Sequence, residues 1–295
     1  MKVRLKIPAT TANLGPGFDC LGCALSMYTY IELESADGVF EILGCDEKYA
    51  GRDNLVYTSY LKALEYMGKK DTGVRITIQT DVPVARGFGS SAAMIVGGVV
   101  GANVLNGSPL SAKELFKICN DIEGHPDNIA PALFGGLTAS MVSNGMPLTV
   151  GYDVHKDFYF CALVPDFETK TSDARSVLPD SVSREDAVYN VSHTALMLKA
   201  LETGNDVLMR HAMSDKLHEP YRKHLIHGFD VVRALALSNG ACSFCISGAG
   251  STCMCITKDE SFGNVMAEKI KDFPNNWQVI MLRPSENGVE VVDVE

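Results

Sequence analysis

The chain has 295 residues, is 46% hydrophobic and 21% charged, and carries a formal net charge of −10. This length and apolar content suffice for one large or two moderate domains, while the acidic balance argues against a nucleic-acid-binding protein and against attraction to an anionic membrane. Nine cysteines, an odd number, and an N-terminus without an apolar signal segment predict a cytoplasmic protein with reduced thiols.

The N-terminal part of the chain predicts a strand, a hairpin and a helix. Alternating apolar residues indicate a strand over residues 2–7, which a long glycine-rich loop, PATTANLGPGFDCLG, follows. Residues 24–34 and 39–43 are expected to form a hairpin with an Asp-Gly turn. Asn54 is a typical N-cap, and the helix after it is expected to end at Gly68.

A second glycine-rich loop, PVARGFGSSAAM, separates the next strand from two helices. The strand is expected over residues 74–78 and the first helix over 91–105. Its apolar stretch, residues 94–105, is too short to span a membrane, and the spacing of Gly97 and Gly101 indicates close helix packing. Ser111 and Glu114 form a capping box at the start of the second helix. The segment GLTASMV is then expected to be a strand.

The stretch SNGMPLTVGYD is a candidate domain boundary, which predicts domains over residues 1–150 and 151–295. The elements expected in the second half are a strand at 158–164, helices within 185–238, strands at 241–246 and 252–256, a helix at 260–271 and a strand at 277–282. Apart from the extra helices, this is the β-α-β-β-α-β order of ferredoxin-like domains.

The loop PVARGFGSSAAM raises the question of why two glycines precede an apolar helix, since glycine loses much conformational entropy on folding. It lacks the motifs of a Walker A loop, a dinucleotide-binding turn and a nucleophile elbow. A glycine loop at a helix N-terminus presents free N–H groups that suit a phosphate, and serine hydroxyls can join a Mg²⁺ shell. Taken alone, however, the loop is better explained as an ordinary strand-to-helix turn.

Three further segments accompany this loop: PATTANLGPGFDCLG before it, then EGHPDNIAPALFGGL and SGAGST after it. In this order and spacing the four segments resemble the GHMP kinases over essentially the whole chain, and the first and third most resemble the homoserine kinases among them. The resemblance implies an α+β fold with an N-terminal domain like ribosomal protein S5 domain 2 and a ferredoxin-like C-terminal domain. It also implies that ATP phosphorylates the hydroxyl of L-homoserine to O-phospho-L-homoserine in threonine biosynthesis, and it allows a homodimer.

By this resemblance, the glycine loop would wrap the phosphates of ATP. The residues implied are Pro83, Val84, Ala85, Arg86, Gly87, Phe88, Gly89, Ser90, Ser91, Ala92 and Ala93. Ser91 and Glu123 would bind Mg²⁺, whose charge is needed because the chain offers little positive charge to the triphosphate. Without the resemblance, Glu123 is more simply a solvated carboxylate at a helix end.

L-Homoserine is a zwitterion, so its site needs an acid or amide for the ammonium group and a cation for the carboxylate. Asn13 and Asp19 resemble the family's ammonium-side residues. Arg175 and Arg222 resemble its carboxylate-side arginines, because a guanidinium binds a carboxylate bidentately. Gly248, in the SGAG loop, is expected to contact substrate. The simpler alternatives are turn hydrogen bonds for Asn13 and Asp19, and two surface arginines.

The segment HPDN carries further residues implied by the resemblance. His125 and Asn128 would lie on the substrate side, with Asn128 orienting the acceptor, and Asp127 is the nearby carboxylate that could take the hydroxyl proton. Positioning alone can serve a loose phosphoryl-transfer transition state, and Asp127 and Asn128 could instead cap the following helix. Thr171 matches a position near the reacting phosphoryl group. Ser251 stands where the family has a proline, which is expected to loosen the SGAG loop.

Two other patterns resemble metal sites. The spacing of Cys242, Cys245, Cys253 and Cys255 is metal-like, but the expected strands direct the first two to opposite faces, so core cysteines are predicted. The segment HEPYRKH lacks the second histidine of the His-Glu-x-x-His zinc motif.

Two other functions compete with phosphorylation of homoserine. A GHMP kinase that acts on mevalonate or a sugar has no acceptor ammonium group for Asn13 and Asp19 to bind. A catalytically silent binding protein with this fold would be expected to lack loop or metal residues, whereas the loop glycines, Ser91 and Glu123 are all present.

Overall fold

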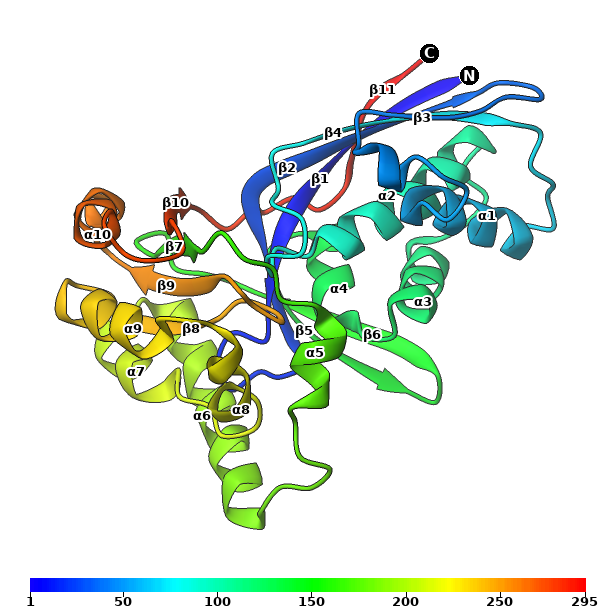
Figure 1. Ribbon diagram of the computed structural model, residues 1–295. Helices are drawn as coiled ribbons and strands as arrows, with labels where there is room; N and C mark the ends of the chain where they lie inside the picture. The colour runs from blue at the N-terminus through cyan, green and yellow to red at the C-terminus, as the bar shows by residue number, and fades with distance from the viewer.

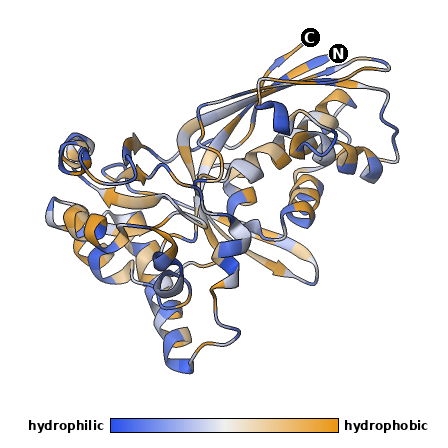
Figure 2. Ribbon diagram, in the orientation of Figure 1, coloured by the Kyte–Doolittle hydropathy of each residue, from blue (hydrophilic) through white to orange (hydrophobic).

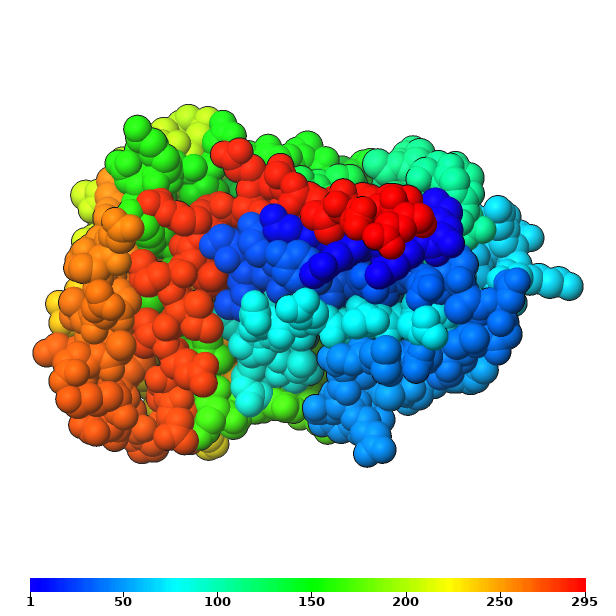
Figure 3. All heavy atoms as spheres, turned by 90° about the horizontal axis from the view of Figure 1, so that it is seen from above, coloured from blue at the N-terminus to red at the C-terminus, as the bar shows by residue number.

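Two β-sheets with helices packed against them make up the protein, and the computed structural model describes residues 1–295 (Figure 1). The first sheet has seven strands in the order β11-β1-β2-β4-β3, with β5 paired to β2 and β6 to β5. Its strands are β1 (Lys2–Ala12), β2 (Leu21–Ser35), β3 (Phe40–Leu43), β4 (Val74–Thr80), β5 (Leu137–Ser143), β6 (Met146–Tyr152) and β11 (Glu290–Val294). Seen from above, the N-terminal and C-terminal segments lie side by side on a face that no helix covers (Figure 3).

Four helices cover the opposite face of the first sheet (Figure 1). They are α1 (Leu55–Tyr66), α2 (Ser90–Leu105), α3 (Ala112–Glu123) and α4 (Pro126–Phe134), and a 3₁₀ turn, η1 (Glu47–Tyr49), precedes α1. The predicted N-cap is confirmed, because the side chain of Asn54 accepts a hydrogen bond from the N–H of Val56. The capping box of Ser111 and Glu114 at the start of α3 is confirmed as well.

The second sheet is four-stranded, in the order β10-β7-β9-β8. Its strands are β7 (Tyr159–Val164), β8 (Ser243–Ile246), β9 (Cys253–Thr257) and β10 (Gln278–Leu282). The helices of this half are α5 (Thr171–Ser176), α6 (Arg184–Thr203), α7 (Asp206–Ala212), α8 (Glu219–Arg222), α9 (Phe229–Ser238) and α10 (Phe262–Ile270), with η2 (Lys223–Leu225) after α8. The predicted ferredoxin-like order is therefore confirmed. Hydrophilic residues gather at the outer end of α6 and in the loop before it (Figure 2).

A buried apolar cluster lies between the two sheets and joins the halves of the chain. It combines Ala9 and Leu25 of the first sheet with Phe160 and Met254 of the second, and it also takes in Phe88 of the glycine loop. Burying these side chains makes the two sheets one packed unit, since each buried large apolar side chain contributes about 1.5–3 kcal/mol. The loops at the junction are thereby held at fixed positions.

The hairpin expected from residues 24–34 and 39–43 is wrong. β3 pairs in parallel with β4, and β4 pairs antiparallel with β2, so β4 lies between the two expected partners. The reason is that β2 uses both of its edges, one for β1 and one for β4, and leaves none for β3. The loop expected after residue 7 is also shorter than predicted, because a register shift at Pro8/Ala9 lets β1 continue to Ala12.

The predicted division at residue 150 differs from the sheet organisation at both ends. β6 continues to Tyr152 and pairs with β5, and β11 returns from the second half to pair with β1. β11 is short and mostly exposed, so its sequence carries no pattern that indicates where it pairs. The boundary between residues 150 and 151 stays a prediction for independent folding units.

The four cysteines with metal-like spacing are all buried and free. The side chains of Cys253 and Cys255 both face helices α9 and α10, because residues two positions apart on a strand point to the same face of the sheet. The prediction that Cys242 and Cys245 point to opposite faces is wrong, because Cys242 precedes β8 and both thiols join the cluster between the sheets. No group of three or more acidic, histidine or cysteine side chains could hold a metal ion, and no helix has the length and apolar character needed to cross a membrane.

Candidate active site

Most of the expected site residues meet in one cavity, open to solvent, at the junction of the two sheets. The β1–β2 loop, the glycine loop, the turn between α3 and α4, and the SGAG loop all contribute to it. Those of the expected residues that line it are Asn13, Asp19, Ala85, Gly87, Gly89, Ser90, Ser91, Glu123, His125, Asp127, Asn128, Thr171, Arg175, Arg222 and Gly248. Segments distant in the sequence are thus brought together as the resemblance implied.

Gly87 and Gly89 of the glycine loop are required by their positive φ angles and by atoms that lie too close for a Cβ. Gly87 has φ +80°, and a Cβ there would lie 2.2 Å from the carbonyl oxygen of Ser247. Gly89, the N-cap of α2, has φ +63°, and its Cβ would lie 1.9 Å from Oγ1 of Thr10. Only glycine combines this conformation with this space. The neighbours that approach the loop are therefore the SGAG loop and the end of β1.

Not every residue of the implied ATP-binding stretch faces the cavity. Phe88, Ala92 and Ala93 are buried in the core, because they pack the loop and the first turn of α2 against the sheets. Val84 is exposed away from the cavity, and Pro83 is not among the lining residues either. The side chain of Arg86 donates to the carbonyl oxygen of Asp166 at 2.9 Å and pairs with Glu168 at 3.5 Å. These six residues do not line the cavity, and their part in binding ATP, which backbone N–H groups can also provide, stays a prediction.

Ser91 and Glu123 face each other across the start of α2. The hydroxyl of Ser91 donates to Oε2 of Glu123 at 2.8 Å. Burial raises the pKa of Glu123, and the hydrogen bond from Ser91 opposes this effect. A carboxylate oxygen and a hydroxyl oxygen this close are hard ligands of the kind that Mg²⁺ prefers, and two protein ligands are typical when a nucleotide supplies the others. The pair therefore fits a magnesium ion that arrives with a phosphate.

The segment HPDN forms a short hydrogen-bonded series at the start of α4. Oδ1 of Asp127 lies 2.6 Å from Nδ1 of His125 and accepts from the N–H of Asn128 at 2.9 Å. Oδ1 of Asn128 accepts from the hydroxyl of Thr10 at 2.7 Å. Burial by itself lowers the pKa of His125, but the hydrogen bond and charge of Asp127 outweigh it and raise the pKa. Neither Asp127 nor Asn128 is the N-cap, because α4 begins at Pro126.

Two arginines and an aspartate line the opposite side of the cavity. Arg175 donates to both carboxylate oxygens of Asp19, at 2.9 and 3.0 Å. Arg222 is only 2% exposed and donates to the carbonyl oxygens of Ala174 and Gly248. Burial, and then the nearby charge of Arg175, lower the pKa of Arg222. This side of the cavity therefore offers both signs of charge within one small space.

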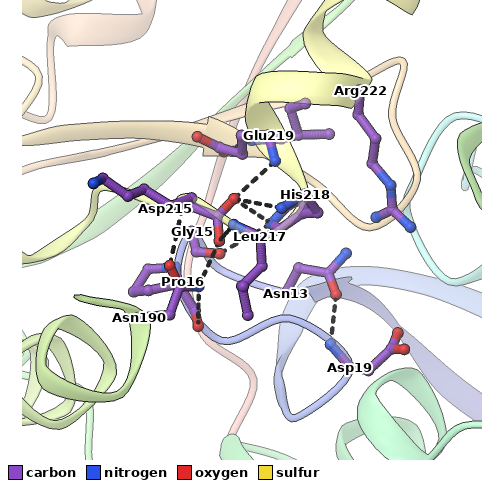
Figure 4. A network of polar contacts seen from close by, with 12 residues as sticks. Asn13, Gly15, Pro16, Asp19, Asn190, Asp215, Leu217, His218, Glu219 and Arg222 are labelled. Carbon is purple, nitrogen blue, oxygen red and sulfur yellow. Dashed lines mark hydrogen bonds and ion pairs between the residues drawn. The ribbon is translucent and has the colours of Figure 1, made fainter. Parts of the chain in front are cut away.

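Asn13 links the β1–β2 loop to the SGAG loop. Its Nδ2 donates to the carbonyl oxygen of Gly248 at 2.7 Å. Its Oδ1 accepts from the N–H of Asp19 at 3.0 Å, as Figure 4 shows. Asn13 and Asp19 thus make the turn hydrogen bond that was the simpler alternative for them, but their side chains also face the cavity. Ser247 adds a second link, because its hydroxyl donates to the carbonyl oxygen of Gly87 at 2.6 Å.

Ser251 is fully buried, and its hydroxyl donates to the carbonyl oxygen of Phe167 at 2.6 Å. This bond ties the SGAG loop to the segment before α5, at the position where the resemblance predicted a looser loop. Three lining residues were missed from the sequence: Thr169, Ala249 and Gly250. Thr169 stands two positions before the predicted Thr171, and the other two belong to the quoted SGAG motif, so extending each motif would have found them.

A glycine loop leading into a helix, a serine–carboxylate pair beside it and an amphoteric pocket opposite define a kinase of small molecules. Residues 54–136 match the GHMP kinases N terminal domain, and residues 197–276 match the GHMP kinases C terminal domain. The chain belongs to the GHMP kinase family.

Within that family, several homoserine kinases are similar to this chain over nearly its full length. Homoserine kinase of Clostridium botulinum (strain ATCC 19397 / Type A) is 40% identical over 291 residues, which cover 98% of each chain. Homoserine kinase of Trichodesmium erythraeum is 41% identical over 292 residues, covering 96% of this chain and 95% of that one. The crystal structure of homoserine kinase from Cytophaga hutchinsonii superposes with a TM-score of 0.89 at 29% identity, covering 99% of this chain and 97% of that one.

Proposed function

We propose that this protein transfers the γ-phosphoryl group of ATP to the side-chain hydroxyl of L-homoserine, giving O-phospho-L-homoserine. The observation that carries the choice of acceptor is the pairing of Asp19 with Arg175, beside the buried Arg222. A zwitterionic amino acid can exchange partners with such a pair, its ammonium group binding Asp19 and its carboxylate binding the two arginines. Full-length similarity to homoserine kinases supports the same assignment.

ATP is proposed to bind with its phosphates against the glycine loop. The N–H groups at the start of α2 and the positive end of its dipole suit the phosphate oxygens. Ser91 and Glu123 would hold Mg²⁺ at this end of the cavity, 2.8 Å apart as they stand. The ion, when bound, supplies the positive charge that neutralises the triphosphate.

The acceptor hydroxyl would lie between the phosphates and the segment HPDN. Asn128, fixed by the hydroxyl of Thr10, orients the acceptor, and Thr171, which also lines the cavity, is proposed to lie near the reacting phosphoryl group. Asp127 is the carboxylate proposed to take the hydroxyl proton, and its bond to His125 holds it in place. Because phosphoryl transfer passes through a loose transition state, these residues act mainly by positioning the two substrates in line.

The substitution Asp127→Asn tests the proton-acceptor role directly. General-base catalysis contributes about 10²–10⁴-fold, so kcat should fall by that factor while the KM for ATP stays unchanged. A loss of less than about tenfold would assign Asp127 a positioning role only, since a base that matters contributes more. Circular dichroism of the variant controls for folding.

The function itself is tested by a coupled ADP-release assay with Mg-ATP and L-homoserine, mevalonate, galactose or no acceptor. Release that depends on L-homoserine, with O-phospho-L-homoserine identified by mass spectrometry, is the expected result. Turnover on mevalonate or galactose alone would overturn the acceptor assignment. Binding of ATP without turnover on any acceptor would favour a catalytically silent binding protein. That the chain forms a homodimer stays a prediction.

A further inference from the structure

The segment HEPYRKH, which has no zinc motif, places a fully buried histidine beneath the acceptor side of the cavity. The Nε2 atom of His218 lies 3.0 Å from the carbonyl oxygen of Gly15, and Nδ1 has no partner (Figure 4). A carbonyl oxygen only accepts, so the proton sits on Nε2 and the ring donates to the β1–β2 loop. Burial lowers the pKa of His218, which keeps the ring neutral.

A buried carboxylate fixes the backbone that carries this ring. Oδ2 of Asp215 accepts from the N–H groups of His218 and Glu219, both at 2.8 Å (Figure 4). Its Oδ1 accepts from the N–H of Leu217 at 3.1 Å and from Nδ2 of Asn190 at 2.6 Å. With four donors, the charge of Asp215 is satisfied although the side chain is buried. The start of α8 is thereby held in one position.

Two side chains of α6, those of Asn190 and Thr194, also hold Pro16, which follows Gly15 in the β1–β2 loop. Nδ2 of Asn190 donates to the carbonyl oxygen of Pro16 at 3.2 Å. The hydroxyl of Thr194 lies 2.8 Å from the same oxygen and 2.7 Å from the carbonyl oxygen of Asn190, so these two acceptors share its proton. The loop therefore receives hydrogen bonds from α6 as well as from His218. All of these donors belong to the second half of the chain, whereas the loop belongs to the first.

The ring of His218 also supports the arginines through Phe18. The two rings stack, with centroids 5.2 Å apart and planes at 20°. The guanidinium carbons of Arg222 and Arg175 lie 4.9 and 5.9 Å from the centroid of Phe18, within the range of cation–π attraction. His218 thus contacts the loop at two places, Gly15 and Phe18.

The β1–β2 loop needs such external support because of its own conformation. Asn13, Leu14 and Asp19 have φ of 70°, 43° and 54°, a region that side-chain-bearing residues seldom adopt. Asn13 and Asp19 are the residues that face the acceptor side of the cavity. A leucine could fill the space of His218 without leaving a buried nitrogen unpaired, but it could not donate to Gly15.

We propose that His218 is a positioning residue for the acceptor: it holds residues 13–19 so that Asn13 and Asp19 face Arg175 and Arg222 across the site. The identity of that acceptor as L-homoserine rests on the proposed function. The side chain of His218 makes its hydrogen bond to Gly15 and none to the glycine loop, so we expect its effect on ATP to be much smaller than its effect on the acceptor.

The test compares His218→Leu, which removes the donor, with His218→Gln, whose amide N–H can reach the same carbonyl. Losing one buried hydrogen bond corresponds to about a tenfold effect, so His218→Leu should raise the KM for L-homoserine about tenfold and leave the KM for ATP unchanged. His218→Gln should recover most of that loss. Ser243→Ala is the matched control, because Ser243 is equally buried in the same half and makes no side-chain hydrogen bond.

Hydrogen exchange followed by mass spectrometry gives a second readout that needs no turnover. Exchange of residues 13–19 should speed up in His218→Leu, and less so in His218→Gln, with residues 85–91 and the Ser243→Ala control unchanged. If wild type does not phosphorylate L-homoserine, the proposed function fails, and the exchange result still decides the proposal. Unchanged exchange and KM, equal defects in both His218 variants, or a joint rise of both KM values would each overturn it.

Discussion

At the scale of single residues, the acceptor side of the cavity carries an aspartate and an arginine whose charges neutralise each other. Asp19 and Arg175 form a bidentate pair in which each side chain is more than one-third exposed. A pair this exposed contributes little to stability, because solvent screens it. Its members are therefore free to exchange partners with a zwitterionic ligand at little cost to the fold.

Arg175→Ala is expected to raise the KM for L-homoserine by about 10–100-fold, since a hydrogen bond to a charged group contributes about 1.5–3 kcal/mol. The KM for ATP should not change. Steady-state kinetics with each substrate varied in turn provides the measurement. Arg184→Ala, at an exposed arginine in the first turn of α6, is the matched control. An unchanged KM for L-homoserine would remove Arg175 from the site.

Glu123→Gln keeps the acceptor for the Ser91 hydroxyl but removes the charge. The Mg²⁺ concentration for half-maximal activity should rise at least about tenfold, a loss typical even of residues that only support metal ligands. Because burial raises the pKa of Glu123, the folded protein should lose no stability from this change. Titration of activity with MgCl₂ at fixed ATP measures the effect, and an unchanged titration curve would argue that Mg²⁺ is held elsewhere.

At the scale of elements, α2 shows how a helix without a polar face is accommodated. Gly97 and Gly101 lie against Ile31 and Leu33 of β2, and Gly98 lies against the backbone of α1. The small-residue spacing seen in the sequence therefore allows close packing on two sides at once. Because α2 begins at Ser90, directly after the glycine loop, the packing of this helix also fixes the position of the loop.

Gly98→Ala should destabilise the protein, because a Cβ there would lie 2.2 Å from the carbonyl oxygen of Val56 and 2.9 Å from the nitrogen of Tyr60. Both neighbours are backbone atoms of α1, so the helices must separate, and overpacking of this kind costs about 1–3 kcal/mol. Urea unfolding measures the change. Gly151→Ala, where nothing lies within 4 Å, is the control, and equal stability of the two variants would contradict the packing argument.

At the scale of the whole molecule, the site exists only where the two sheets meet. The bond from Asn13 to Gly248 joins residues 235 positions apart. The buried cluster between the sheets and the pairing of β11 with β1 hold these segments in place relative to each other. A cavity assembled this way depends on global stability, and one half-buried glutamate in the second half, whose carboxyl is desolvated, makes that stability depend on pH.

Burial raises the pKa of Glu219 from its ordinary 4.5 to about 8, with Asp215 adding to the effect and the N–H of Ile246 and Arg233 opposing it. The folded state keeps this proton where the unfolded state releases it, so the carboxyl lowers stability as the pH rises from 4.5 to about 8. Glu219→Gln removes the proton equilibrium. The free energy of unfolding of the variant, relative to that of wild type, should therefore rise by up to about 1.4 kcal/mol for each pH unit inside this window.

Urea unfolding at pH 5.5, 6.5 and 7.5, about one pH unit apart, measures the difference between variant and wild type. Glu260→Gln, at an exposed glutamate before α10, controls for the loss of a charge. A difference between Glu219→Gln and wild type that stays constant over these three pH values would show that Glu219 does not hold a proton in the folded state.

The sequence by itself determined the features that depend on near neighbours. The cap at Asn54, the capping box at Ser111 and the strand–helix order of the second half follow from local hydrogen bonding and periodicity. The resemblance to a kinase family, carried by four short motifs, supplied the residues that line the cavity. The sequence indicated that the glycines of the loop PVARGFGSSAAM have a structural role, but it did not indicate which atoms lie close to them.

Only the tertiary structure decided which strands pair and which motif residues face the cavity. β4 takes the edge of β2 that β3 was expected to use, and Phe88, Ala92 and Ala93 turn into the core although they stand inside the phosphate-type loop. The support of the acceptor loop by His218 joins residues 203 positions apart. Such choices follow from how much apolar surface the whole chain can bury and which buried polar atoms can find partners, and neither quantity is local to any stretch of sequence.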